Sequence, residues 1–167
     1  RPALKISRRL VSLLIIIGIC AAAVFYGVRH TRPARVVYVS SEQNISDVVA
    51  VNLPDTDASL LAWWKNNRDA LRTNFNIPRP DSADGSWTIV FWNYGDGFKA
   101  SNEHESPFLN PFYTETYCFD SIKSDRNCID KDIAMMVSQS TNGAVFITTA
   151  RGHYHIDRAG ERTPLHK

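Results

Sequence analysis

SLLAWWKNNRDALRTNF, residues 59–75, is the stretch that indicates how the C-terminal part of the chain folds. Its apolar side chains fall on one helical stripe, and most of its charged residues lie elsewhere on the helix; the stripe consists of Leu60, Trp64, Leu71 and Phe75. This pattern predicts an amphipathic helix. Pro78 and Pro80 follow at once, and proline excludes continuation of the helix beyond them.

Runs rich in β-branched and aromatic residues stand on both sides of this helix and predict strands. Two precede it, at residues 35–40 and 46–53, and one follows it at residues 87–92. Three more are IAMMVSQ (133–139), AVFITTA (144–150) and HYHID (153–157), and Asn142-Gly143 between the first two is a hairpin signal. Residues 100–116 lack periodicity and predict a long loop. The fold class is therefore α+β, with a mainly antiparallel sheet packed against one amphipathic helix.

The N-terminal part contains LVSLLIIIGICAAAVFYGV, residues 10–28, nineteen residues without a charge. As a helix it is roughly 28 Å long, close to the thickness of the hydrocarbon core of a bilayer. Arginines flank it on both sides. A cleaved signal peptide is the alternative, but the apolar run is longer than a typical signal core and no small-x-small cleavage site follows it. We therefore expect a transmembrane helix at 10–28, after a basic cytoplasmic tail at 1–9.

Charge divides the chain at the same place. Residues 1–35 carry seven Lys or Arg and no acid, whereas residues 36–167 carry twelve Lys or Arg and seventeen Asp or Glu. After a linker at 29–35, the folded domain at 36–167 is therefore mildly acidic, with a net charge near −5. It shows no basic patch suited to a phosphate backbone, which argues against a nucleic-acid partner.

The cysteines indicate the compartment. Cys20 lies within the apolar run, which leaves Cys118 and Cys128 as a pair in the folded domain with nine residues between them. The pair shows neither a CxxC motif nor the Cys/His spacing of a zinc site. A disulfide is the favoured interpretation, and two reduced thiols in a cytosolic domain are the alternative. A disulfide requires an oxidising compartment, so we expect the N-terminus in the cytoplasm and the domain in the periplasm.

Several motifs along the chain resemble one known family. An N-terminal span is followed by DVVAVNLP, LAWWKNNRDAL, NIPRP, TIVFWNYGDGF and YCFD…NCI, in that order. This combination resembles the enterobacterial single-pass inner-membrane proteins grouped as domain-of-unknown-function family 943. The resemblance covers nearly the whole chain and implies a bacterial envelope protein. It implies no activity that can be assigned to a residue.

Aromatic residues are the best candidates for binding. Trp64 and Trp87 are suited to pack the helix on the sheet. Trp63 cannot face the same side of the helix as Trp64, and we expect it to be partly exposed. With Tyr94 and Asp96 it forms the candidate partner-binding set. No catalytic, cofactor-binding or metal-ligating residue is predicted.

Two classes of function remain open. The first is a non-catalytic, membrane-anchored module that binds another protein of unknown identity, for example as an immunity protein against a delivered toxin. The second is an envelope enzyme or a small-ligand or metal-binding protein that uses His153 and His155, which alternate with Asp157 along a predicted strand. Glu103, His104 and Glu105 form a further polar cluster, which is more simply explained as a solvated loop.

Overall fold

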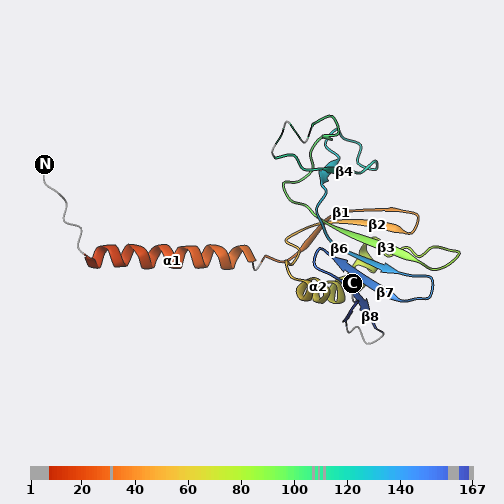
Figure 1. The fold of residues 1–167 in the computed structure, drawn as a ribbon, viewed down its shortest axis with the longest axis horizontal. Helices are drawn as coiled ribbons and strands as arrows, with labels where there is room; N and C mark the ends of the chain where they lie inside the picture. Colours follow the sequence, from red (N-terminus) through yellow and green to blue (C-terminus); the bar gives the residue numbers. More distant parts are fainter. Residues whose placement is uncertain are drawn as a thin grey trace. The chain divides into compact units, whose positions relative to one another are not determined.

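A computed structural model describes residues 8–30, 32–106, 108, 110, 112–157 and 162–165 of the chain. The chain divides into two compact units, residues 1–33 and 34–167. Among the described residues, the first unit contains one helix, and the second contains the sheet and the amphipathic helix (Figure 1). The disulfide also lies in the second unit.

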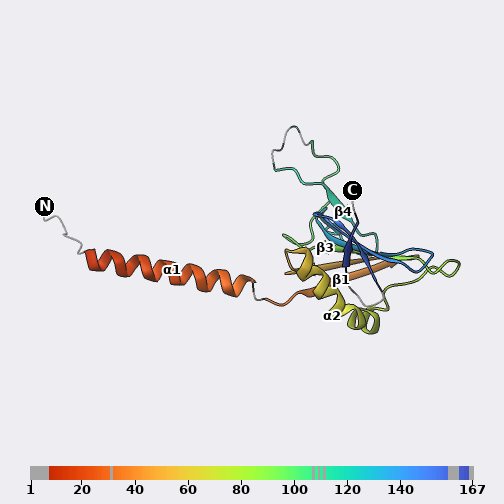
Figure 2. The ribbon, with the colours of Figure 1, turned by 60° about the horizontal axis from the view of Figure 1, so that its bottom comes forward.

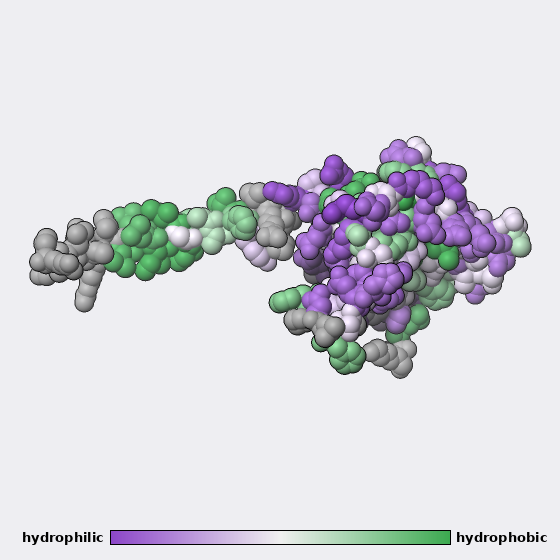
Figure 3. Space-filling model, turned by 90° about the horizontal axis from the view of Figure 1, so that it is seen from above, coloured by the Kyte–Doolittle hydropathy of each residue, from purple (hydrophilic) through white to green (hydrophobic). Residues whose placement is uncertain are grey.

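The first unit contains α1 (Arg8–His30). Its described side chains, at residues 11–27, are all exposed, and most are hydrophobic (Figure 3). The sequence-based prediction of a helix over residues 10–28 is therefore confirmed. Among the residues that the structure describes, no helix combines the length and the apolarity needed to cross a bilayer. The membrane span remains a prediction.

In the second unit the described strands form one main sheet. Its spatial order is β1 (Arg35–Glu42), β2 (Ile45–Val51), β3 (Trp87–Asn93), β6 (Ile133–Gln139), β7 (Val145–Thr149), β8 (His153–Ile156) and β9 (Arg162–Pro164). All neighbours pair antiparallel except β2 and β3, which are parallel. The predicted α+β class with a mainly antiparallel sheet is confirmed. The parallel pair follows from the connection, because α2 (Asp57–Phe75) links the end of β2 to the start of β3.

Helix α2 begins and ends at residues suited to capping. The side-chain oxygen of Thr56 accepts a hydrogen bond from the Ser59 amide, and Asn76 adopts a left-handed conformation with φ of 55°. The predicted stripe is correct for three of its four residues. Phe75 is 39% exposed, because the chain turns at Asn76 and Ile77 enters the core in its place with 0% exposure.

The core on the α2 side of the sheet contains the aromatic contact that the sequence predicted. Trp64 from α2 and Trp87 from β3 have ring centroids 6.4 Å apart, and both side chains are less than a tenth exposed. Alternate residues of the central strands point to this side, and they are Val48, Ile89, Phe91, Met135, Val137 and Ile147. Burial of these side chains is the main favourable contribution to the stability of this layer.

The opposite face of the sheet is covered by a short hairpin of β4 (Thr116–Cys118) and β5 (Cys128–Asp130). Figures 1 and 2 show β4 and α2 on opposite sides of the sheet. Phe119 and Ile129 from the hairpin segment pack with Val49, Val90 and Trp92 from the sheet. The domain therefore has a second core, which the sequence pattern did not predict.

Candidate functional site: an acidic pocket beside the disulfide

The disulfide closes the β4–β5 hairpin. Cys118 and Cys128 are directly opposite in the strand register and are joined by an S–S bond of 2.05 Å. The predicted pairing is confirmed. The bridge joins the two strands of the hairpin to each other, while burial of Phe119 (3% exposed) and Ile129 (0%) packs the hairpin against the main sheet. The structure thus places the chain between the two cysteines beside strands β1 and β2.

A pocket of about 450 Å³ lies between this hairpin and the first two strands. We call it the acidic pocket. Its wall combines carboxylates, hydroxyls and aromatic rings, and it is lined by Tyr38, Val39, Ser40, Ser41, Glu42, Asp47, Tyr117, Cys118, Phe119, Asp120 and Ser121. Glu42 and Asp120 are exposed, while Asp47 is half-buried. Three carboxylates and no cation among these residues make it a negatively charged recess.

Asp47 is the most constrained carboxylate of the acidic pocket. Its Oδ1 accepts a hydrogen bond of 2.8 Å from the indole Nε1 of Trp92. Burial raises the pKa of Asp47 and the negative charge of Glu42 adds to the rise, although the hydrogen bonds from Trp92 and Tyr117 act in the other direction. Burial raises the pKa of Tyr117 as well, and the charges of Asp47, Glu42 and Asp120 raise it further. The charges of all three carboxylates therefore raise the pKa of the same phenol, that of Tyr117.

Aromatic rings form the other wall of the acidic pocket. Tyr117 stacks on Trp92 with ring centroids 4.5 Å apart, and Phe119 meets Tyr38 and Tyr117 edge-on at 5.2 and 5.1 Å. The hydroxyl of Tyr38 also hydrogen-bonds to Ser121 in the hairpin. Carboxylates beside aromatic faces are suited to a guanidinium or ammonium group, which gains both charge pairing and cation–π attraction. The chemistry available in this pocket is binding of a cation.

Apart from Cys118, the residues of the acidic pocket were not predicted from the sequence. Asp47 is the one signal that was available, because strand alternation places it on the same face as Val49, which is fully buried. A carboxylate on the buried face of a strand needs an explanation. Glu42, Asp120 and Tyr117 gave no comparable signal, since their proximity depends on how the hairpin folds back.

The predicted partner-binding residues do not form one surface. Trp63 is half-buried and packs edge-on against Phe91 at 5.6 Å in the core on the α2 side. Tyr94 packs with Phe98 at 5.5 Å against the core on the hairpin side, and Asp96 is exposed in the turn that follows β3. The expected partial exposure of Trp63 agrees with its position. Its role in binding, and that of the other two residues, remains a prediction.

The histidines and acids considered for a metal or catalytic site are separated. On β8, His153 hydrogen-bonds through Nδ1 to Thr148 at 3.0 Å, and the His155 ring lies 5.5 Å from that of Phe146. Glu103, His104 and Glu105 are exposed. Within the described part of the chain, no three His, Cys, Asp or Glu residues are placed to hold one metal ion.

A buried acid at the start of α2 has a structural role that the sequence did not reveal. Asp57 is 8% exposed, and its Oδ2 accepts a hydrogen bond of 2.5 Å from the hydroxyl of Tyr154 on β8. Arg151 lies 3.5 Å from its Oδ1. Burial by itself would raise the pKa of Asp57, but hydrogen bonds from Tyr154 and Thr149 and the charge of Arg151 outweigh it, so the pKa is lowered. This contact joins the start of α2 to β8, next to the terminal strand β9 of the described sheet.

Fold and pocket together define a small α+β protein with an N-terminal helix in a unit of its own and a polar recess. The chain belongs to the family described as enterobacterial putative membrane protein (DUF943), whose family model matches residues 5–165. The resemblance drawn from the sequence motifs is confirmed. No curated protein and no solved structure matches the chain.

Proposed function

We propose that this protein is anchored in the bacterial inner membrane by α1 and that its periplasmic domain binds a basic segment of another protein without catalysis. The apolar run at residues 10–28 with its flanking arginines supports the anchor. The disulfide between Cys118 and Cys128 supports an oxidising compartment, since such bonds are rare in the cytosol. The family description as a membrane protein supports the presence of a membrane anchor.

The acidic pocket is the observation that carries the binding function. It gathers three carboxylates beside the half-buried rings of Tyr38 and Tyr117 in a volume of about 450 Å³, which is enough for one or two long basic side chains. The domain as a whole carries a net charge near −5, which would steer a basic partner toward it. An arginine inserted here would meet both carboxylates and ring faces.

The arrangement favours a protein partner over a small cation. Residues 38–42 of β1 line the pocket, and β1 is the terminal strand of the described sheet. A partner that inserts a basic side chain can therefore extend its contacts along an edge strand. Immunity against a basic toxin delivered into the periplasm is one task that such a surface could perform. The alternative use of His153 and His155 gains no support from their positions on β8.

Comparative capture tests this proposal. Full-length protein carrying Glu42→Gln, Asp47→Asn and Asp120→Asn is compared with wild type as bait in detergent-solubilised native envelope. A matched control carries Asp81→Asn, Glu103→Gln and Glu105→Gln, which remove three negative charges outside the pocket. We expect wild type and control to retain a basic protein that salt elutes, and the pocket variant to lose it. Retention of the same proteins by the pocket variant would contradict the proposal.

A further inference from the structure

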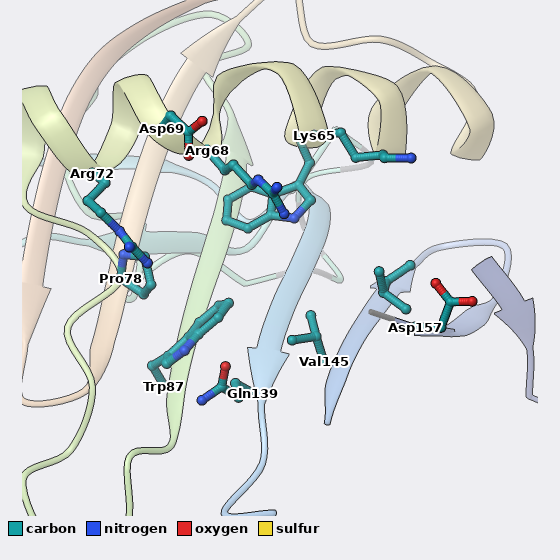
Figure 4. A pocket seen from close by; sticks show the side chains of 11 residues that line it. Lys65, Arg68, Asp69, Arg72, Pro78, Trp87, Gln139, Val145 and Asp157 are labelled. Atoms are coloured by element: carbon teal, nitrogen blue, oxygen red, sulfur yellow. The ribbon is translucent and has the colours of Figure 1, made fainter. Parts of the chain in front are cut away.

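A second recess lies on the α2 side of the sheet, away from the acidic pocket. It has a volume of about 440 Å³ and is bounded by α2, by Pro78 and by residues of β3, β6, β7 and β8. Figure 4 shows Lys65, Arg68 and Arg72 projecting from α2, with Trp87, Gln139 and Val145 facing them from the strands. We call this recess the basic groove.

The charge of the basic groove is opposite to that of the domain. Three cations and two acids line it, so it is net positive, whereas residues 36–167 carry five more acids than bases. Elsewhere in the domain, Lys99 pairs with Asp130 at 2.8 Å and Lys131 pairs with Glu115 at 2.7 Å. A positive recess in an acidic domain is complementary to a negatively charged ligand.

The groove cations have no protein partner among the described residues. Neither an ion pair nor a side-chain hydrogen bond joins Lys65, Arg68 or Arg72 to another residue in that part of the chain. The three positions follow one another at intervals of three and four residues, which brings them to one side of α2. Two guanidinium groups one helical turn apart can hold a phosphate or carboxylate through several charge-assisted hydrogen bonds.

The remaining wall of the basic groove is apolar. Trp64 and Trp87 form its floor, with Val145, Ile156 and Pro78 around them. The side-chain amide of Gln139 is held in place because its Nε2 donates a hydrogen bond of 3.2 Å to the Gly85 carbonyl. Sites for small molecules commonly combine an apolar wall with a few fixed polar groups, within volumes of about 300–1,000 Å³.

We propose that the basic groove binds an organic anion, in which a phosphate or carboxylate lies between Arg68 and Arg72 and an apolar body rests on Trp87 and Val145. The proposal does not depend on the proposed function, because the acidic pocket is built from the other face of the sheet. The same chemistry is presented by a free metabolite and by the headgroup region of an anionic lipid.

Calorimetric titration of the full chain in nanodiscs of neutral lipid tests the proposal, with 1-naphthyl phosphate as the probe and empty nanodiscs as the blank. We expect saturable, stoichiometric binding that neither inorganic phosphate nor 1-naphthol reproduces. Arg68→Gln with Arg72→Gln should weaken binding about tenfold or more, because charge-assisted hydrogen bonds are lost. Arg79→Gln with Lys123→Gln removes the same charge outside the groove and should leave the affinity unchanged.

Three results would overturn the proposal: binding that survives in the Arg68→Gln and Arg72→Gln variant, equal loss in the control variant, or equal affinity for inorganic phosphate. A shift of the Trp87 indole resonance on titration provides a second measurement that does not require a variant to fold. Nanodiscs that contain phosphatidylglycerol identify the source. Competition by these discs supports a lipid headgroup, and undiminished binding of the probe supports a free anion.

Discussion

The indole Nε1 of Trp92 donates a hydrogen bond of 2.8 Å to Oδ1 of Asp47 across the parallel strands β2 and β3. Trp92 is 4% exposed and Asp47 is half-buried, so a hydrogen bond inside the second core orients a carboxylate toward the acidic pocket. Burial raises the pKa of Asp47, which means that its charged form is disfavoured in the folded state. A group that opposes folding and lines a pocket is a candidate for function.

Asp47→Asn should therefore raise the free energy of unfolding at pH 7. Asparagine keeps an oxygen that can accept the Trp92 hydrogen bond but has no charge to desolvate. Because the folded-state pKa of Asp47 lies above its ordinary value of 3.8, wild type loses stability as the pH rises from 3.8 through the folded-state pKa. Urea unfolding at a series of pH values measures the difference in unfolding free energy between Asp47→Asn and wild type. This difference should vanish below pH 3.8. A variant that is less stable than wild type at pH 7 would contradict this interpretation.

Asp57 should show the opposite pH dependence. Its pKa is lowered, so its contribution to stability is present above its ordinary value of 3.8 and is lost as the pH falls through the folded-state pKa. Asp57→Asn should lower the free energy of unfolding by about 1.5–3 kcal/mol at neutral pH, as expected for a hydrogen bond to a charged group. Tyr154→Phe should act in the same direction. Asp69→Asn, an exposed acid on the same helix, is the control. If the difference in unfolding free energy between Asp57→Asn and wild type stays constant across acidic pH, the charge of Asp57 is not its cause.

Loss of the disulfide should loosen the hairpin. Replacement of Cys118 and Cys128 by alanine should lower the free energy of unfolding by about 2–3 kcal/mol, because the sequence separation of ten residues closes a short loop in the unfolded chain. Thermal unfolding with and without reductant measures this effect. Reductant should shift the wild type but not the variant, and Cys20→Ser, in α1, should behave as wild type. Equal midpoints for the double variant and wild type would show that packing alone holds the hairpin.

The two adjacent tryptophans should differ in how much each contributes to the free energy of unfolding. Trp64 is 7% exposed, and Trp64→Ala should cost about 3–5 kcal/mol as a truncation in the core. Trp63 is half-buried against Phe91, so Trp63→Ala should cost roughly half as much. Chemical denaturation separates the two values. If the partner engages the acidic pocket, Trp63→Ala should leave its affinity unchanged; weaker binding by the folded variant would instead support the sequence-based assignment of Trp63 to the interface.

Much of the fold could be predicted because its signals are local. The stripe of α2 and the strand runs at 87–92 and 133–157 depend on spacing within one segment, and the structure contains these elements. The disulfide could be predicted because only two cysteines lie outside the apolar run. These features follow from side-chain periodicity and from cysteine chemistry.

The candidate site could not be predicted, because it depends on contacts between distant segments. Tyr117 meets Asp47 only after the hairpin has folded back across the sheet, and no periodic pattern in residues 116–130 predicts that direction. The basic groove arises in the same way, since α2 and Trp87 come together through the parallel pairing of β2 with β3. The charge of residues 65–72 was visible in the sequence, but the apolar wall opposite it was not.

Topology is the prediction on which the proposed function depends most. With α1 as an anchor, a C-terminal alkaline phosphatase fusion should be active, since that enzyme requires the oxidising periplasm for its own disulfides. A C-terminal fluorescent protein that matures only in the cytoplasm should be dark, and the same protein fused to the N-terminus should fluoresce. Deletion of residues 10–28 is the control, because it removes the apolar run and should abolish phosphatase activity while leaving the domain sequence intact.

Reduction followed by a membrane-impermeant thiol reagent on intact spheroplasts adds an independent measurement of topology: the reagent should label the domain through Cys118, which is half-buried. Fluorescence from the C-terminal fusion would place the domain in the cytoplasm and would contradict both the anchor orientation and the periplasmic partner.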